Sequence, residues 1–148
     1  QIARHGRDSR PPEWIALDAL FDPVLQRLHQ KEMTWRIDGD RDLRVRAHPT
    51  LLRALIDNLV GNVLAHGRPG SEVLVQWSSA PAVSLSLRNL CADAPRDEQH
   101  LGAGLDIAAL YAFALRAEIH TGRDGDWFEA RLQFAAPDVA APPFDARA

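Results

Sequence analysis

Residues 58–66 read Asn58-Leu-Val-Gly-Asn62-Val-Leu-Ala-His66, and this stretch is the strongest indication of the fold in the chain. It ends a run, Leu51–Leu64, in which apolar residues recur at helical spacing. At about 100° per residue these apolar residues cover one broad face, and Asn62 projects within it. Asn58 stands at the edge of that face one turn earlier, and His66 follows one turn later. The pattern predicts a helix that carries polar groups on a buried face.

A buried amide on such a helix needs hydrogen-bond partners, because leaving it unpaired costs about 1–3 kcal/mol. Two interpretations are open at this point. The amides can hydrogen-bond a neighbouring loop, which is a structural role, or they can line a cleft that binds a polar ligand. The remainder of the chain favours the cleft.

A second motif lies further along the chain, where Leu101-Gly102-Ala103-Gly104-Leu105 leads into the apolar run 106–115. Glycines permit close approach of the backbone to a ligand. The free N–H groups at the start of a helix suit a phosphate. We therefore expect a helix that begins near Asp106, directly after the glycines. Because this helix is apolar nearly all round, we also expect it to be buried on most sides.

These two motifs resemble the boxes of the ATP-binding catalytic domain of sensor histidine kinases, a branch of the GHKL, or Bergerat, ATPase superfamily. Residues 58–62 followed by His66-Gly67 are similar to the N-box, and Gly102-Ala103-Gly104, some forty residues later, is similar to the G2 box. The resemblance covers about residues 13–136. It implies an α/β (α+β) sandwich, in which a mixed five-stranded sheet carries helices layered on one face.

The resemblance implies ATP and Mg²⁺ as ligands. Asn62 matches the family position that binds the magnesium ion between the phosphates, and an amide oxygen is a suitable hard ligand for it. Asn89 matches the position that accepts a hydrogen bond from the adenine amine, and His66 falls beside the nucleotide. The implied nucleotide-binding residues are Asn58, Asn62, His66, Asn89, Gly102, Gly104 and Leu105.

The sequence departs from the family pattern at several of these positions. The G1 box, Asp-x-Gly-x-Gly in the family, has Asn89, Cys91 and Asp93 here. An amide oxygen still accepts the adenine bond, but without charge assistance. The basic residue that often precedes the ring is Ala65, with Arg68 or Arg96 as candidate replacements. The lid, residues 94–101, is short and lacks a Phe motif, and Asp106 stands where the G2 box has another glycine.

Composition narrows the function further. The chain has 148 residues and a net charge of −3, which argues against a nucleic-acid footprint. The single cysteine, Cys91, fits a reducing compartment. No apolar run approaches the roughly 20 residues of a membrane span, so we expect a cytoplasmic segment that makes no membrane contact. The chain begins with Gln1, which is typical of a piece of a longer protein, and the resemblance implies that the full-length protein is anchored in the inner membrane.

The predicted organisation has three parts: residues 1–12 as a linker from an upstream dimerisation helix, 13–136 as the catalytic domain, and 137–148 as a disordered Ala/Pro-rich tail. His5 lacks the acidic neighbour of the phosphoacceptor motif, so the phosphorylated histidine is expected outside this segment. The expected strands are 14–17, 33–37, 43–47, 72–77, 83–87, 118–121 and 127–134. The expected early helices are one capped by Asp18 or Asp22 that runs through His29, and one capped by Thr50 that Gly67 ends.

Two functions from different classes remain. The first is the catalytic domain of a two-component histidine kinase, which transfers the γ-phosphoryl group of ATP to a histidine on a separate domain. Its partners are the dimerisation domain of the same kinase and a response regulator in a phosphorelay, with a homodimeric full-length protein. The second is a non-catalytic regulatory module that binds nucleotide weakly or not at all. The surviving Asn58, Asn62 and Gly-x-Gly favour the first. Asp57 occupies the place where other ATPases of the superfamily carry a catalytic Glu, but the chain lacks their additional domains.

Overall fold

The computed structural model describes residues 11–79, 82–92 and 98–135, with side chains from residue 105 in the last range. Its regular elements run from Glu13 to Phe134. In chain order they are β1 (Glu13–Ala16), α2 (Leu17–Leu25), the 3-10 helix η1 (Gln26–Lys31), β2 (Thr34–Asp38), β3 (Arg44–Ala47), α3 (Pro49–His66), β4 (Glu72–Ser78), β5 (Ser84–Leu90), α4 (Glu98–Ala114), β6 (Ala117–Asp124) and β7 (Trp127–Phe134).

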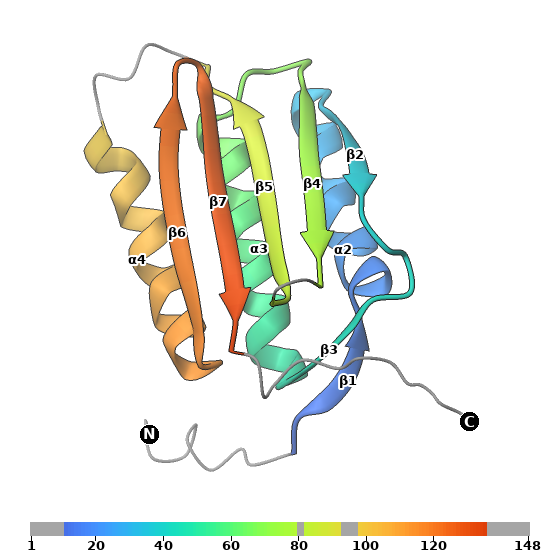
Figure 1. Ribbon diagram of the computed structural model, residues 1–148. Coiled ribbons are helices and arrows are strands. Elements are labelled where there is room, and N and C mark those ends of the chain that lie inside the picture. The colour runs from blue at the N-terminus through green and yellow to red at the C-terminus, as the bar shows by residue number, and fades with distance from the viewer. Residues whose placement is uncertain (1–10, 80–81, 93–97, 136–148) are drawn as a thin grey trace.

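The strands form one large and one small sheet. The five-stranded sheet has the order β2-β4-β5-β7-β6, in which β2 and β4 are parallel and every other pair is antiparallel. Strands β1 and β3 form a separate antiparallel pair. Helices α2, α3 and α4 all lie on one face of the large sheet (Figure 1). The predicted mixed five-stranded sheet with helices on one face is confirmed.

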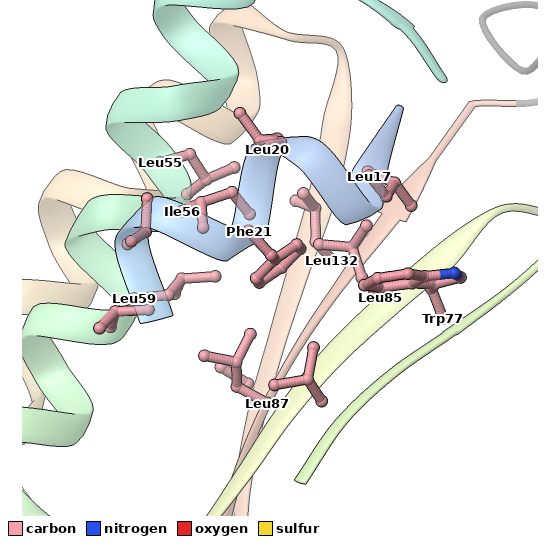
Figure 2. Packing of buried hydrophobic residues seen from close by; sticks show 14 of the residues in the cluster. Leu17, Leu20, Phe21, Leu55, Ile56, Leu59, Trp77, Leu85, Leu87 and Leu132 are labelled. Atoms are coloured by element: carbon pink, nitrogen blue, oxygen red, sulfur yellow. The ribbon is translucent and has the colours of Figure 1, made fainter. Parts of the chain in front are cut away.

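The main core fills the space between the helices and the sheet (Figure 2). Each fully buried Leu, Ile or Phe contributes about 1.5–3 kcal/mol relative to an exposed side chain. Trp77 of β4 closes one end of this core, with its ring centroid 5.6 Å from that of Phe21 and its indole N–H donated to the carbonyl of Asp40 at 2.6 Å. The side chains that meet here come from α2, α3 and three strands: Leu17, Leu20, Phe21, Leu55, Ile56, Leu59, Trp77, Leu85, Leu87 and Leu132.

Both ends of α3 are set by local sequence. Pro49 occupies its first turn, where a fixed φ and a missing N–H cost nothing, so His48 rather than Thr50 is the N-cap. Gly67 ends the helix as predicted, with an extended backbone (φ −78°, ψ 156°). A larger residue does not fit there, because a Cβ would lie 2.5 Å from the Met33 methyl carbon. The predicted cap at Thr50 is wrong, and the predicted stop at Gly67 is confirmed.

The first helix also begins earlier than predicted. Its N-cap is Ala16, and the helix continues past His29 as η1. Neither Asp18 nor Asp22 caps it, because both lie inside the helix. Asp18 is used elsewhere, since its carboxylate accepts a hydrogen bond from the Arg41 guanidinium at 2.5 Å. A long-range ion pair therefore replaces the expected local cap.

Helix α4 differs from its prediction in two ways. It begins at Glu98 instead of near Asp106, so Gly102 and Gly104 lie inside the helix and not before it. It is also not buried on most sides, because Leu110 is 71% and Phe113 83% exposed. Among its described side chains, residues 105–114, the small Ala108 and Ala112 are the buried ones, so this part of the helix packs through a narrow stripe and leaves an apolar face uncovered.

The predicted linker and tail fall largely outside the described residues. Residues 1–10 and 136–148 lie outside the described residues, and residues 11–12 precede β1 without regular structure. Within the part of the chain that the structure describes, no helix is both long and apolar enough to span a bilayer.

Candidate functional site

The two asparagines of α3 lie where the helical pattern predicts. Asn62 is only 8% exposed, although it is polar, and Asn58 one turn earlier is half-buried. Leu55, Leu59 and Val63 around them are buried against the rest of the core. The amide of Asn62 is therefore held inside the hydrophobic layer and not on the surface.

One flank of α3 is bonded to the 3-10 helix η1. The Asp57 carboxylate accepts a hydrogen bond from the Arg27 guanidinium at 2.6 Å. The Lys31 ammonium donates to the carbonyls of Leu64 and Gly67 at 2.7 and 3.2 Å, and so satisfies the end of the helix. Asp57 is thus occupied by an ion pair on this flank.

The asparagines face the opposite side of α3. At about 100° per residue, Asn58 and Asn62 lie roughly 100–140° around the helix from Asp57. Helix α3 contacts η1, α2 and α4. It lies between α2 and α4 on the sheet (Figure 1), so the flank away from η1 is the one toward α4. Asn58 and Asn62 therefore line the boundary between α3 and α4.

Two buried amide oxygens in this region have no hydrogen-bond partner among the described residues. One is Oδ1 of Asn58. The other is Oδ1 of Asn89, whose residue is only 2% exposed, while its Nδ2 donates to the carbonyl of Leu90 at 3.0 Å. A buried unpaired acceptor costs about 1–3 kcal/mol. Such groups are the arrangement expected when a ligand supplies the missing donors.

Backbone hydrogen bonds hold the end of β5 against the end of α3. The Arg68 N–H donates to the Leu90 carbonyl at 2.8 Å, and the Ala92 N–H donates to the His66 carbonyl at 2.9 Å. A β-bridge joins Gly67 to Cys91. In Figure 1 these two ends and the start of α4 lie at the same end of the molecule, at the top of the view. The structure thus brings together the segments that carry Asn62, His66 and Asn89.

Asn89 itself lies within β5, which extends to Leu90 and not to residue 87 as predicted. The extension follows from pairing with β7, in which Asn89 is opposite Phe128 and Leu90 opposite Trp127. Asn89 points to the same face as the buried Leu85 and Leu87, toward the helices.

Arg68, one of the two candidates for the missing basic residue at position 65, contacts other groups in this structure. Its Nε donates to the Cys91 carbonyl at 3.2 Å, and its guanidinium lies 3.5 Å from the Asp126 carboxylate. These contacts direct it to the β6–β7 turn. The other candidate, Arg96, lies outside the described residues, as does Asp93 of the G1-like segment.

The glycine motif lies in the first turns of α4. Gly102 and Gly104 are helical, and Leu105 that follows is half-buried against the core. In a helix each backbone N–H beyond the first turn is bonded to the carbonyl four residues earlier. The N–H groups near Gly104 therefore become available to a phosphate only if the first turns of α4 unwind.

The donors that the described residues offer to a magnesium ion are few. Among the described residues, no three His, Cys, Asp or Glu side chains form a group that could hold a metal. The fitting donors are the amide oxygens of Asn58 and Asn62, of which the first is an orphaned buried acceptor. An ion that keeps most of its waters and takes its remaining ligands from phosphate fits such a set, and an all-protein metal site does not.

A hollow of about 420 Å³ lies on the opposite, open face of the sheet. It is lined by polar side chains that include Gln76, Ser86 and Arg131. The sheet separates it from Asn62 and Asn89, which point toward the helices. The unpaired amide oxygens, and not this hollow, therefore define the candidate site.

Some residues that shape the site could not be found from the sequence. Lys31 fixes the end of α3 from a position 33 residues earlier, and Arg27 reaches Asp57 from 30 residues earlier. Both residues look like typical surface cations of a helix, and the sequence around them does not indicate which distant groups they bind.

No family model matches the chain. The solved catalytic domain of the histidine kinase ThkA superposes with a TM-score of 0.73 at 16% identity, covering 91% of this chain and 100% of that one. The Acinetobacter baumannii histidine kinase AdeS gives 0.73 at 16% identity, over 89% of this chain and 71% of that one. The ATP-binding domain of PrrB from Mycobacterium tuberculosis gives 0.65 at 18% identity, over 87% and 98%.

These likenesses establish the fold. The chain is built as the catalytic, ATP-binding domains of sensor histidine kinases are, over nearly its whole described length. The resemblance inferred from residues 58–67 and 102–104 is confirmed at the level of the fold.

Proposed function

We propose that this chain is the ATP-binding catalytic domain of a two-component sensor histidine kinase. It binds Mg-ATP and presents the γ-phosphoryl group to a histidine on a separate domain. That domain belongs to the dimerisation region of the same kinase, and a response regulator receives the phosphoryl group in turn. In this reaction the domain contributes mainly by positioning the phosphoryl group and neutralising its charge, and takes no covalent part.

One observation carries this proposal: the buried, unpaired amide oxygens of Asn58 and Asn89 lie on the helix-facing side of the fold. A core with two orphaned acceptors is unfavourable without a ligand. A ligand that bears an exocyclic amine at one end and a hydrated cation at the other satisfies both, and Mg-ATP has these groups.

In the proposed complex adenine lies between α3 and β5, with its amine donating to Asn89. The phosphates extend along the boundary between α3 and α4 toward Gly102, Gly104 and Leu105. Asn62 and Asn58 hold the magnesium ion and its waters, and His66 flanks the nucleotide. When bound, the ion neutralises phosphate charge, while the asparagine amides orient its water shell.

A second candidate, a non-catalytic regulatory module, is favoured by a different observation. Helix α4 runs unbroken through Gly102 and Gly104, and Arg68 is bound to Asp126, so a ready-made phosphate cradle and its cation are both missing from the described residues. Such a module acts through protein contacts and binds nucleotide weakly or not at all.

Titration of the domain with ATP, with and without Mg²⁺, tests the proposal. Magnesium-dependent binding followed by calorimetry, together with phosphoryl transfer from labelled ATP to the histidine-bearing region of the full-length protein, is the expected result. Binding without transfer to any histidine supports the regulatory module. The absence of ATP binding, in the domain and in the full-length protein alike, contradicts the kinase proposal.

A further inference from the structure

The C-terminal end of α3 is held from two sides by groups outside the helix. The last four carbonyls of any α-helix have no hydrogen-bond partner within it. In α3 the Leu64 carbonyl accepts a hydrogen bond from the Lys31 ammonium at 2.7 Å. The His66 carbonyl accepts one from the Ala92 N–H at 2.9 Å. Because Lys31 belongs to η1 and Ala92 follows β5, the end of the helix is bonded to both of these segments.

Lys31 also holds the turn that follows α3. Its ammonium donates a second hydrogen bond to the Gly67 carbonyl at 3.2 Å, and its own carbonyl accepts one from the Gly70 N–H at 3.0 Å. Lys31 is half-buried, and among the described residues no carboxylate forms an ion pair with it. The positive charge therefore stays at the helix terminus, where it also interacts favourably with the negative end of the helix dipole.

The other side of this turn meets the end of β5, where the candidate site lies. Gly67 forms a β-bridge with Cys91. His66 is the last residue of α3 and directly precedes the bridge, and Asn89 lies in β5 two residues before Cys91. A displacement of the turn would therefore move the His66 side chain relative to the Asn89 amide.

Arg27 of the same 3-10 helix is bonded to α3 at a different place. Its guanidinium donates to the Asp57 carboxylate at 2.6 Å, in the middle of the helix. There the backbone is already fixed by the hydrogen bonds of the helix itself. Loss of the Arg27 side chain should therefore leave the end of α3 in place, which makes Arg27 a matched control for Lys31.

We infer that Lys31 is a positioning residue of the proposed nucleotide site. It lies on the flank of α3 away from Asn58 and Asn62, so it does not touch the nucleotide in the proposed complex. It acts through the turn of residues 67–71, which holds His66 against the end of β5. This positioning role rests on the proposed function, because it requires a nucleotide between α3 and β5.

Titration of the chain with Mg-ATP, followed by NMR, tests this role and also measures weak affinities. Lys31→Met keeps most of the aliphatic stem and removes the donors, so ATP affinity is expected to fall about tenfold. Lys31→Arg again offers N–H donors to the same carbonyls, and its affinity should stay within about threefold of the parent chain. Arg27→Met removes a cation from the same 3-10 helix, and its affinity should stay within about twofold.

A double-variant cycle separates positioning from a general effect on the fold. If Lys31 acts through His66, Lys31→Met should weaken ATP binding little further once His66→Ala has removed the ring. If Lys31 acts elsewhere, the two losses should add in full. Melting temperatures confirm that each variant is folded during the titration. Lys31→Gln, which keeps a neutral donor, takes the place of Lys31→Met if that variant does not fold.

Four results would overturn the positioning role: parent-like ATP affinity in Lys31→Met, an equal loss in Arg27→Met, no recovery in Lys31→Arg, or fully additive losses for Lys31→Met and His66→Ala. If neither the parent chain nor the full-length protein binds ATP, the proposed function itself fails, and the positioning role fails with it. A parent chain that binds ATP, with any of the four results, leaves the proposed function in place.

Discussion

The Asn89 side chain is hydrogen-bonded through its amide nitrogen, while its amide oxygen has no partner among the described residues. Its Nδ2 is fixed by the Leu90 carbonyl, so the amide cannot exchange its oxygen and nitrogen without placing two acceptors together. The oxygen is then the group presented to the interior of the fold, and it has no partner. In this orientation the Asn89 amide oxygen can accept a hydrogen bond from an amino group, and it repels a carbonyl oxygen.

Asn89→Asp is expected to have opposite effects on stability and on binding. The free domain loses about 1–3 kcal/mol of stability, because a carboxylate oxygen replaces the N–H group that now donates to Leu90. ATP binding tightens, because a charged acceptor makes the stronger hydrogen bond to the adenine amine. Chemical denaturation and calorimetry measure the two effects. Unchanged ATP affinity would place adenine away from this strand, and Asn89→Leu, which removes both groups, provides the control.

Asn62→Ala is expected to remove magnesium-dependent nucleotide binding while leaving the fold intact. The amide sits in an apolar layer, and its replacement by a methyl group takes away the proposed metal ligand without stranding another polar group. Thermal melts with and without Mg-ATP measure this, and Asn62→Asp, which keeps an oxygen, should retain part of the ligand-induced shift. A large fall in the melting temperature of the free protein, with the ligand shift preserved, would identify Asn62 as a structural amide.

Among the secondary-structure elements, those bounded by local chemistry were predictable. Helix α3 could be predicted from its apolar period and its end from Gly67, although Pro49 places its start one residue before the predicted cap at Thr50. The start of α4 was wrong because the glycines suggested a break, whereas the helix continues through them. The end of β5 was missed because pairing with β7, forty residues later, extends the strand to Leu90. A non-local contact thus decided the end of β5.

In the candidate site, the burial of Asn62 was predictable, because the helical period places this polar residue on the apolar face. The hydrogen bonds that the buried amides make or lack could not be predicted. The commitment of Asp57 to Arg27 and of Arg68 to Asp126 depends on residues brought close only by folding. The sequence alone therefore could not show that the Asp57 and Arg68 side chains are already engaged in ion pairs.

The position of Gly102 and Gly104 inside α4 leads to a prediction about that helix. Alanine at both positions should raise the stability of the free domain by about 1–2 kcal/mol, since glycine costs about 0.5–1 kcal/mol in a helix interior. If phosphate binding requires these turns to unwind, the same change should weaken ATP binding by about 5- to 30-fold. Melting curves and calorimetry give both values.

The control for this variant is Gly122→Ala. A Cβ added at Gly122 of β6 meets no atom within 4 Å, so the substitution changes backbone freedom away from α4. It should leave ATP affinity unchanged. Equal ATP affinity in the Gly102→Ala/Gly104→Ala variant and the parent chain would mean that the phosphates do not use the start of α4.

Across the whole molecule, the structural contacts and the proposed binding residues lie on different sides of α3. The flank toward η1 is bonded through Arg27 and Lys31, which secures the helix without any ligand. The flank toward α4 carries Asn58 and Asn62, and it meets the end of β5 with its open acceptor. The domain can therefore fold without nucleotide and still retain unsatisfied groups that a nucleotide would complete.

This division predicts weak ATP binding by the chain on its own. Ala65 supplies no cation, Arg68 is held by Asp126, Asn89 offers an uncharged acceptor, and the first turns of α4 must open. If two or three of these each cost about 1 kcal/mol, affinity falls by roughly 30- to 150-fold relative to a site with all contacts present. Calorimetry on the chain alone and on the full-length protein measures the difference, since docking on the histidine-bearing domain can supply the missing contacts. Tight binding by the chain alone would mean that the losses at Ala65 and Asn89 are compensated within it.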